Sequence, residues 1–255
     1  MATVPTTDGS LTLESSVYGE SYRSRHGALS ESRHVFLDAS GVLEALSRRS
    51  AEATATATAV RVLEVGFGTG LNFLVTACAV LDTIADEEPS GVGGTNGRRL
   101  HYTALENDPP ALAAVASLDY SHLLSPCRLP DELLRWWRGL GEPLTPGSHR
   151  FATSEAARVE LELLITDARG YLAAAEQFDA IYLDPFSPKA NPELWTEPFL
   201  APLAAALKPG GRLVTYSVSG AVRRTLEGAG LRVTKVPGPP GGKREVLSAC
   251  RPKSR

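Results

Sequence analysis

Short apolar runs alternate with longer amphipathic stretches from residue 59 onward, and this alternation limits the fold more than any other feature. Short runs rich in β-branched residues indicate buried strands, and periodic stretches between them indicate helices. Strands that alternate with helices predict a parallel sheet with right-handed crossovers. We expect strands at residues 59–65, 100–105, 159–165, 178–183, 212–217, 231–236 and 245–250, and helices at 71–81, 109–118, 131–140, 170–175, 197–207 and 220–229.

The last two expected strands are joined by residues 237–243 (PGPPGGK), which are too few for a crossover helix. These strands should therefore be antiparallel neighbours. The expected fold is α/β, with a doubly wound, seven-stranded, mostly parallel sheet that ends in an antiparallel hairpin. This pattern resembles the Rossmann-like fold of class I S-adenosylmethionine (SAM)-dependent methyltransferases. We expect one such domain over residues 51–255, with residues 1–50 packing over its active site.

Length and composition fit one large domain, because 255 residues can bury a substantial core. No apolar run approaches the roughly 20 residues that span a bilayer, and the polar first ten residues do not resemble a secretory signal. Cys78, Cys127 and Cys250 show no CxxC spacing, and Cys78 lies in an apolar helical pattern. We therefore expect a cytoplasmic protein that has no membrane partner, no disulfide and no metal site. Residues 48–59 read as an unstructured Thr/Ala-rich connector.

Charge is distributed unevenly along the chain, although the formal net charge is only −3. Residues 208–255 contain four Lys and seven Arg against two Glu, a formal charge of +9, so the remaining residues carry −12. Such asymmetry can mark a surface that binds a polyanion. The alternative is an ordinary solvated surface whose cations are balanced by acidic neighbours in space.

A glycine-rich turn follows the first expected strand and opens the next helix. Ligands of such sheets bind beyond the carboxyl ends of the strands, where glycines let the backbone approach them closely. The acidic Glu64 before the turn would repel a dinucleotide pyrophosphate but suits the ammonium of SAM. The glycine spacing also differs from the dinucleotide fingerprint. A purely structural turn is the alternative. The expected SAM-binding residues here are Glu64, Gly66, Phe67, Gly68, Thr69 and Gly70.

Two further acidic residues follow the second and third expected strands. Glu106 can accept hydrogen bonds from both ribose hydroxyls of a nucleoside cofactor. Asp167 stands where such folds contact the adenine amino group. Either residue alone could be an ordinary surface carboxylate, but their position after consecutive strands favours a nucleoside-binding edge.

The fourth expected strand ends in the sequence DPFSP, which begins at Asp184. A similar turn occurs at this position in amine methyltransferases. A nitrogen nucleophile gains positive charge as it attacks the methyl group, and a carboxylate can orient its N–H groups and accept the proton. We therefore expect Asp184 to be catalytic and to contact SAM, and Phe186 to stack on a base. A proline-rigidified loop is the structural alternative.

Longer motifs carry a more specific resemblance. Residues 17–37 contain VY, a later Gly27 and ESRHVFL, residues 66–74 read GFGTGLNFL, and residues 184–195 read DPFSPKANPELW. These are followed by KPGG at 208–211 and by KREVL at 243–247. Together they resemble the methyltransferase domain of the MnmC family of tRNA wobble-uridine modification enzymes, over nearly the whole chain.

The resemblance implies methyl transfer from SAM to the amino group of 5-aminomethyl-2-thiouridine at the tRNA wobble position, giving 5-methylaminomethyl-2-thiouridine. It implies a cofactor role for Asn72, a uridine pocket or lid formed by Lys189, Asn191 and Trp195, and closure of the site by Glu31 and Arg33. An ion pair that only holds the N-terminal segment is the alternative for that last pair. Contacts to tRNA phosphate are expected from the basic C-terminal part, at Arg223, Lys243 and Arg244.

The chain departs from the family pattern in three places. The turn at Asp184 has Pro185 and Ser187 where the family usually has Gly and Ala, and Glu106 is followed by Asn107 where the family has Lys. The family's two-domain form also continues into an FAD oxidoreductase that makes the amine. We therefore expect a standalone methyltransferase that uses no FAD and depends on a separate enzyme for the aminomethyl group.

Two other functions remain open from the sequence. An aminopropyltransferase of the spermidine synthase type shares the fold and the Asp after the fourth strand, but it normally has a second acid just before that Asp. Here Ile181 and Tyr182 occupy those positions, and Asp179 is the only other acid. A SAM-binding protein without turnover is the second alternative. The sequence indicates neither the oligomeric state nor the tRNA species.

Overall fold

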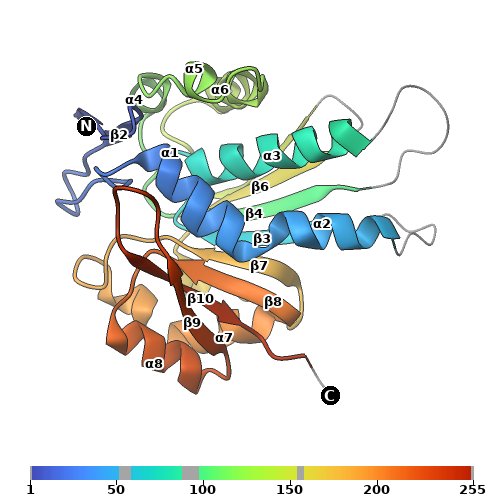
Figure 1. The fold of residues 1–255 in the computed structure, drawn as a ribbon. Coiled ribbons are helices and arrows are strands. Elements are labelled where there is room, and N and C mark those ends of the chain that lie inside the picture. Colours follow the sequence, from blue (N-terminus) through green and yellow to red (C-terminus); the bar gives the residue numbers. More distant parts are fainter. Residues whose placement is uncertain (1, 52–58, 88–97, 154–157, 254–255) are drawn as a thin grey trace.

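The computed structural model describes residues 2–51, 59–87, 98–153 and 158–253. A central sheet has the strand order β5-β6-β4-β3-β7-β8-β10-β9 (Figure 1). The five strands from β6 to β8 run parallel, and β10 is antiparallel to both β8 and β9. The strands are β3 Val60–Val65, β4 Leu100–Glu106, β5 Gly147–Ala152, β6 Val159–Ile165, β7 Phe178–Leu183, β8 Leu207–Thr215, β9 Arg232–Pro237 and β10 Glu245–Cys250.

These strands confirm the α/β fold class and the antiparallel C-terminal hairpin, but the sheet has one strand more than the seven expected. The additional strand, β5, pairs antiparallel with β6 at the edge of the sheet. Its sequence GSHRFA has little apolar character, and only Phe151 is buried. An exposed edge strand needs few buried residues, so its hydrophobic pattern is too weak to be recognised.

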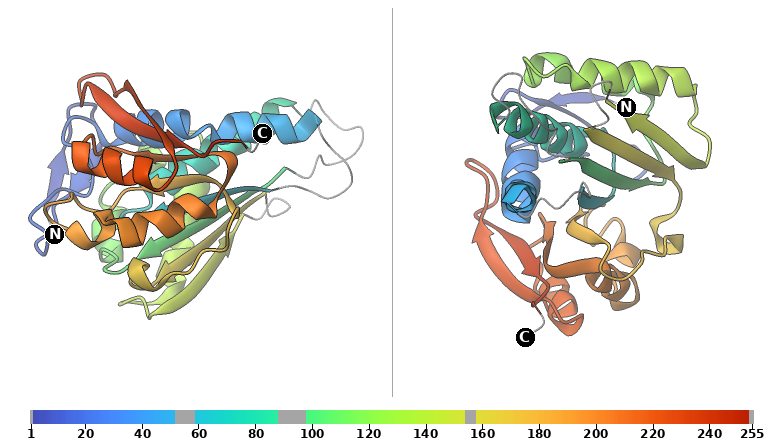
Figure 2. Two further views of the ribbon diagram at one scale, coloured as in Figure 1. Left: turned by 90° about the horizontal axis from the view of Figure 1, so that it is seen from below. Right: turned by 90° about the vertical axis from the view of Figure 1, so that its right-hand side faces the viewer.

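Helices cover both faces of the sheet (Figure 2). Helix α3 is apolar over most of its length because it is enclosed between the sheet and neighbouring helices. In α6 the buried Leu129, Leu133 and Trp137 recur every fourth residue, which places them on one face of the helix. One core includes side chains of α1 Ala28–Glu31, the π-helix η1 Ser32–Asp38, α2 Val42–Ala51, α3 Leu71–Glu87 and α6 Leu129–Leu140, and the other includes α7 Glu197–Ala206 and α8 Gly220–Gly228.

Several expected local elements differ from the structure. The helix expected at 170–175 is wrong: a 3-10 turn, η2 (Ala168–Gly170), is followed by non-helical residues, and Leu172 is 91% exposed. The helix expected at 109–118 is shorter in the structure, where α4 covers Leu112–Ala116, and a separate short helix, α5 (Tyr120–Leu123), follows it. Of the connector expected at 48–59, residues 48–51 belong to α2 and 52–58 lie outside the described residues.

The N-terminal segment lies beside the carboxyl ends of the parallel strands (Figure 1). It begins with a hairpin of β1 (Thr3–Pro5) and β2 (Leu11–Leu13). Leu13 is fully buried, and its carbonyl accepts a hydrogen bond from the backbone of Tyr22 at 2.9 Å. None of the described helices is long and apolar enough to cross a membrane.

A disulfide joins Cys78 in α3 to Cys127, which lies just before α6. The expectation of free thiols is therefore wrong for these two residues. This pairing has no local signal, because the cysteines are 49 residues apart and meet only when α6 folds back against α3. The third cysteine, Cys250, is free.

We predict that breaking this bond lowers the free energy of unfolding by about 2–4 kcal/mol, because the open chain gains conformational entropy when unfolded. Denaturant unfolding of the Cys78→Ser/Cys127→Ser variant measures the change, and the partly buried Cys250→Ser is the control. Equal stability of the parent protein with and without reductant would contradict the prediction.

Candidate active site

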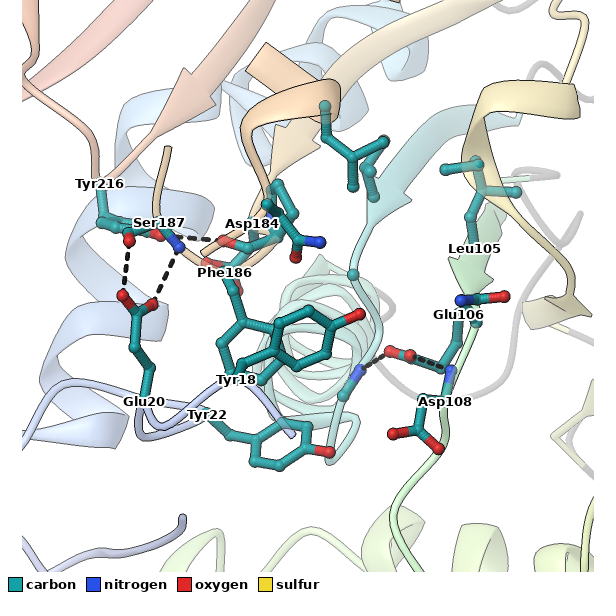
Figure 3. A pocket seen from close by; sticks show the side chains of 18 of the residues that line it. Tyr18, Glu20, Tyr22, Leu105, Glu106, Asp108, Asp184, Phe186, Ser187 and Tyr216 are labelled. Carbon is teal, nitrogen blue, oxygen red and sulfur yellow. Dashed lines mark hydrogen bonds between the residues drawn. The ribbon is translucent and has the colours of Figure 1, made fainter. Parts of the chain in front are cut away.

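A cavity of about 400 Å³ opens at the carboxyl ends of β3, β4, β6 and β7. The N-terminal segment, residues 18–25, forms another of its walls. In Figure 3, the aromatic rings of Tyr18, Phe186 and Tyr22 lie between Glu106 on one side and Tyr216 on the other. The cavity therefore brings together segments that are far apart in the sequence. The expected site residues that line it are Glu31, Gly66, Gly68, Glu106, Asp167, Asp184, Phe186, Asn191 and Lys243.

The glycine turn is fixed by its closeness to the end of β7. Gly66 has a φ of 91°, and a Cβ there would lie 2.6 Å from the carbonyl oxygen of Asp184. A side chain at this position would therefore be strained and would also clash with the backbone. The Asp184 N–H donates to the carbonyl of Val65 at 3.0 Å, so the two loops are tied together.

Glu106 lies on the floor of the cavity after β4. Its carboxylate accepts hydrogen bonds from the backbone N–H of Gly68 at 2.7 Å and of Asp108 at 2.9 Å (Figure 3). Burial raises the pKa of Glu106, while the backbone donors oppose that rise. Asp167 lies at the end of β6, where hydrogen bonds from Arg169 lower its pKa. Two carboxylates thus flank the edge where a nucleoside is expected to bind.

A buried network of charged and polar groups lies behind the glycine turn. Asn72 donates from one amide nitrogen to Glu64 at 2.8 Å and to Asp184 Oδ2 at 2.9 Å. The hydroxyl of Tyr102 donates to the other oxygen of Glu64 at 2.9 Å. The guanidinium of Arg23 donates to Asp184 Oδ2 and lies 3.8 Å from Glu64. Asn72 therefore holds Asp184 and links it to Glu64, and neither Asn72 nor Glu64 lines the cavity.

Burial determines the protonation of these acids. It raises the pKa of Glu64 to about 8 and that of Asp184 to about 7, in both cases against the opposing effect of Arg23. Burial also raises the pKa of Glu31, whose carboxylate accepts the backbone N–H of Ser24. A carboxyl group with a pKa near neutral pH can both accept and release a proton under ordinary conditions.

Aromatic rings form much of the wall near Asp184. Tyr18 stacks on Phe186 with ring centroids 4.3 Å apart, and Tyr22 meets the same ring edge-on. The hydroxyl of Tyr216 donates to the carbonyl of Pro185 at 2.8 Å, and the ammonium of Lys243 lies 4.4 Å from the centre of the Tyr216 ring. One face of Phe186 is thus covered by Tyr18.

The loop after Asp184 is held by side chains from both ends of the chain. Glu20 accepts hydrogen bonds from the backbone and the hydroxyl of Ser187 (Figure 3). The indole of Trp195, in the 3-10 turn η3 (Pro192–Trp195), donates to the carbonyl of Phe186 at 3.0 Å. Trp195 is buried and does not line the cavity, so it affects the cavity only through the loop that it holds.

The remaining expected residues lie away from the cavity. Phe67 packs in the core against Phe73 and Trp137, and Thr69 bonds the hydroxyl of Tyr120. Gly70 adopts a φ of 81° next to the Phe67 ring. Exposed side chains that do not line the cavity are those of Arg33, Lys189, Arg223 and Arg244.

Many cations of the basic C-terminal part pair with carboxylates, as the solvated-surface alternative requires. The pairs are Lys208 with Asp179, Arg212 with Glu44, Arg223 with Glu227, Lys235 with Glu245 and Arg251 with Glu176. Lys243 differs from these, because it lies at the cavity and faces an aromatic ring.

Sequence reasoning missed four residues of the site: Tyr18, Tyr22, Arg23 and Tyr216. Tyr18 belonged to the quoted motif, but no role was assigned to it. Arg23 and Tyr22 lie in a segment without periodicity, and only the folded chain places them opposite Asp184. The adjacent residues Tyr22 and Arg23 form no recognisable motif, so no signal in the sequence indicates a role for either of them.

Comparison with known proteins agrees with this geometry. Residues 140–252 match the model of a family described as S-adenosyl-L-methionine-dependent methyltransferase. The crystal structure of MnmC2 from Aquifex aeolicus is similar with a TM-score of 0.70 and 27% identity, over 99% of this chain and 72% of that one. The family match runs from the end of α6 through β10 and spans less than half of the chain. SAM is the cofactor that this similarity implies.

Curated relatives of this chain carry the name tRNA 5-methylaminomethyl-2-thiouridine biosynthesis bifunctional protein MnmC. The protein from Aromatoleum aromaticum is 38% identical over 94% of this chain, and that from Chromobacterium violaceum is 36% identical over 91%. These matches confirm the resemblance inferred from the motifs. The chain spans about one third of the length of these relatives (34% and 32%).

The buried acids of the site lead to a prediction about the pH dependence of stability. A carboxyl whose pKa rises from 4.5 unfolded to about 8 folded binds more protons in the native state between those values. Stability therefore falls as pH rises through that window, by at most about 1.4 kcal/mol per pH unit for one group. We predict that Glu64→Gln flattens this fall and is less destabilising at pH 8 than at pH 5.

Urea unfolding of the parent protein and of Glu64→Gln at several pH values measures the effect. The exposed pair partner Glu162, changed to Gln, is the control. Parallel pH profiles of the parent and Glu64→Gln would show that Glu64 is ionised throughout.

Proposed function

We propose that this methyltransferase transfers a methyl group from SAM to the amino group of 5-aminomethyl-(2-thio)uridine at the wobble position of tRNA. The observation that carries the proposal is the buried Asp184. Its backbone lies against the glycine turn at Gly66, and the residue lines a cavity with aromatic walls. The names of the MnmC relatives supply the identity of the modified nucleoside.

The residues present fit SAM as the cofactor. The glycine turn exposes backbone to the cavity at Gly66 and Gly68, and Glu106 and Asp167 follow the next two strands of the sheet. We propose that Glu106 binds the ribose hydroxyls and that Asp167 lies near the adenine. SAM supplies an electrophilic methyl group on a sulfonium, and the acidic surroundings favour its positive charge.

Asp184 is proposed to remove the proton that the acceptor ammonium must lose before its nitrogen can be methylated. An aliphatic amine is mostly protonated at neutral pH, and its ammonium form has no lone pair. Asp184 accepts one proton from that ammonium, the freed lone pair forms the N–C bond, and the C–S bond breaks with its electrons left on sulfur. A pKa near 7 suits a group that must take up and then release this proton.

The uridine ring is proposed to lie against the aromatic wall. Phe186 offers a planar surface beside Asp184, and base–aromatic stacking is an ordinary mode of RNA recognition. Because Tyr18 covers one face of Phe186, the base must use the other face or the edge of that ring, stack on Tyr18 or displace Tyr18. Lys243 at the rim can contact phosphate.

The aminopropyltransferase alternative is less well supported. Enzymes of that type normally have a second acid just before the Asp, on the same strand, and Asp179 is the only other acid in β7. Asp179 lies near the start of β7, at the opposite end of that strand from Asp184, and pairs with Lys208. It therefore cannot contribute to a polycation pocket at the carboxyl end.

The deciding experiment uses purified protein, labelled SAM and tRNA that carries 5-aminomethyluridine at the wobble position, followed by nucleoside mass spectrometry. We expect a gain of one methyl group on that nucleoside. Asp184→Asn should lose at least about 100-fold in rate, because general-base catalysis contributes about 10²–10⁴-fold. Intact SAM binding without transfer by the parent protein would overturn the proposed acceptor.

A second prediction concerns the cofactor. Glu106→Ala removes a charged hydrogen-bond acceptor, which is worth about 1.5–3 kcal/mol, so SAM should bind about 10- to 100-fold more weakly. Isothermal titration calorimetry measures the dissociation constant, and Glu162→Ala on the exposed side of β6 is the matched control. Unchanged affinity in Glu106→Ala would exclude Glu106 from the ribose site.

A further inference from the structure

Arg23 is the buried cation that meets the proposed catalytic acid, and nothing in the sequence motifs assigns it a role. Its side chain is 2% exposed and is enclosed between the N-terminal segment and the ends of β3 and β7. We propose that Arg23 is a positioning residue that orients Asp184 and keeps it ionised for the acceptor amine. This inference rests on the proposed function and deepens it.

The two carboxylate oxygens of Asp184 have different surroundings. Oδ2 accepts hydrogen bonds from both the Arg23 guanidinium and the Asn72 amide. Within the part of the chain that the structure describes, Oδ1 accepts none, and Asp184 lines the cavity. With Oδ2 fixed from behind, Oδ1 is the oxygen available to an ammonium group in the cavity.

Asp184 needs the Arg23 guanidinium in order to stay ionised, because other features of its surroundings oppose a negative charge there. Burial opposes ionisation of Asp184, and the nearby carboxylate of Glu31 opposes it further, while Arg23 and Asn72 favour it. Glu64 from β3 also faces the cluster, and Lys243 approaches from the β9–β10 loop. Tyr216, from the segment after β8, faces the same carboxylate. Arg23 is the only one of these groups that is both cationic and in contact with Asp184.

The position of Arg23 is itself well determined. Its backbone N–H donates to the hydroxyl of Thr12 at 2.9 Å, which anchors it to the β1–β2 hairpin. Its guanidinium lies 6.0 Å from the centre of the Phe36 ring. Two Nη atoms reach two different carboxylates, a geometry that a lysine ammonium reproduces only in part. The N-terminal segment therefore carries a functional group into the site.

The test compares the parent protein with Arg23→Gln, Arg23→Met and Arg23→Lys. Arg23→Met keeps the length and apolar contact of the side chain if the Gln variant does not fold, and Arg23→Lys keeps the charge. Arg150→Gln, at an 81% exposed side chain on β5, is the matched control. SAM binding and thermal unfolding establish that each variant is folded.

Two readouts are taken from each protein. Carbon-13 NMR follows the titration of the Asp184 carboxyl, assigned with Asp184→Asn, and needs no turnover. Methyl transfer to the aminomethyluridine tRNA is measured as a function of pH. In the Gln and Met variants we expect the Asp184 midpoint to rise by about one to three pH units. Transfer at pH 7 should fall about tenfold or more and recover as pH rises, while Arg23→Lys keeps a profile close to that of the parent.

The outcomes separate this inference from the proposed function. No transfer by the parent protein overturns the proposed acceptor, and the NMR titration still decides whether Arg23 controls Asp184. An unchanged Asp184 midpoint in both neutral variants overturns the inference. A loss of transfer that is the same at every pH, with Lys no better than Met, assigns Arg23 a structural role only and also overturns it.

Discussion

The parallel pairing of β3 with β7 is the constraint on which the site depends. Because the two strands run side by side in register, the turn after β3 and the turn after β7 begin at the same edge of the sheet. The approach is so close that Gly66 has no room for a Cβ beside the Asp184 carbonyl. The pairing of these two strands therefore places the backbone proposed to face SAM next to the carboxylate proposed to face the acceptor.

The N-terminal segment, residues 18–25, supplies contacts of the site that the sheet does not provide. Glu20 holds the loop after Asp184 through Ser187, Tyr18 covers Phe186, and Arg23 neutralises part of the buried acid cluster. These contacts come from a stretch of eight residues without regular secondary structure of its own, anchored by the β1–β2 hairpin. The core supplies the acids, and this segment supplies the cation and one aromatic wall, so the charge balance of the site depends on both.

The sequence predicted those parts whose physical signal is local. Apolar β-branched runs located all seven expected strands, and the glycine turn and the acids after β4, β6 and β7 were found because the strand ends were known. The edge strand β5 was missed because an exposed strand needs few apolar residues. The Cys78–Cys127 disulfide and the Arg23–Asp184 pair were missed because each joins segments that only the folded chain brings together. A contact between two single residues that are far apart in the sequence produces no periodic pattern by which it could be predicted.

The charge balance of the cavity bears on why an amine would be the acceptor. Glu31, Glu64 and Asp184 are buried near one guanidinium, so full ionisation would leave a net negative charge in a region shielded from water. Burial resists that state by raising the pKa of each acid. A ligand that brings positive charge relieves the same cost, because it compensates the carboxylates where water cannot. A sulfonium cofactor and an ammonium acceptor both do so, whereas a neutral oxygen or carbon nucleophile brings no charge to compensate the acids. The electrostatics of the site thus favour a cationic pair of reactants, most strongly at the oxygen of Asp184 that faces the cavity.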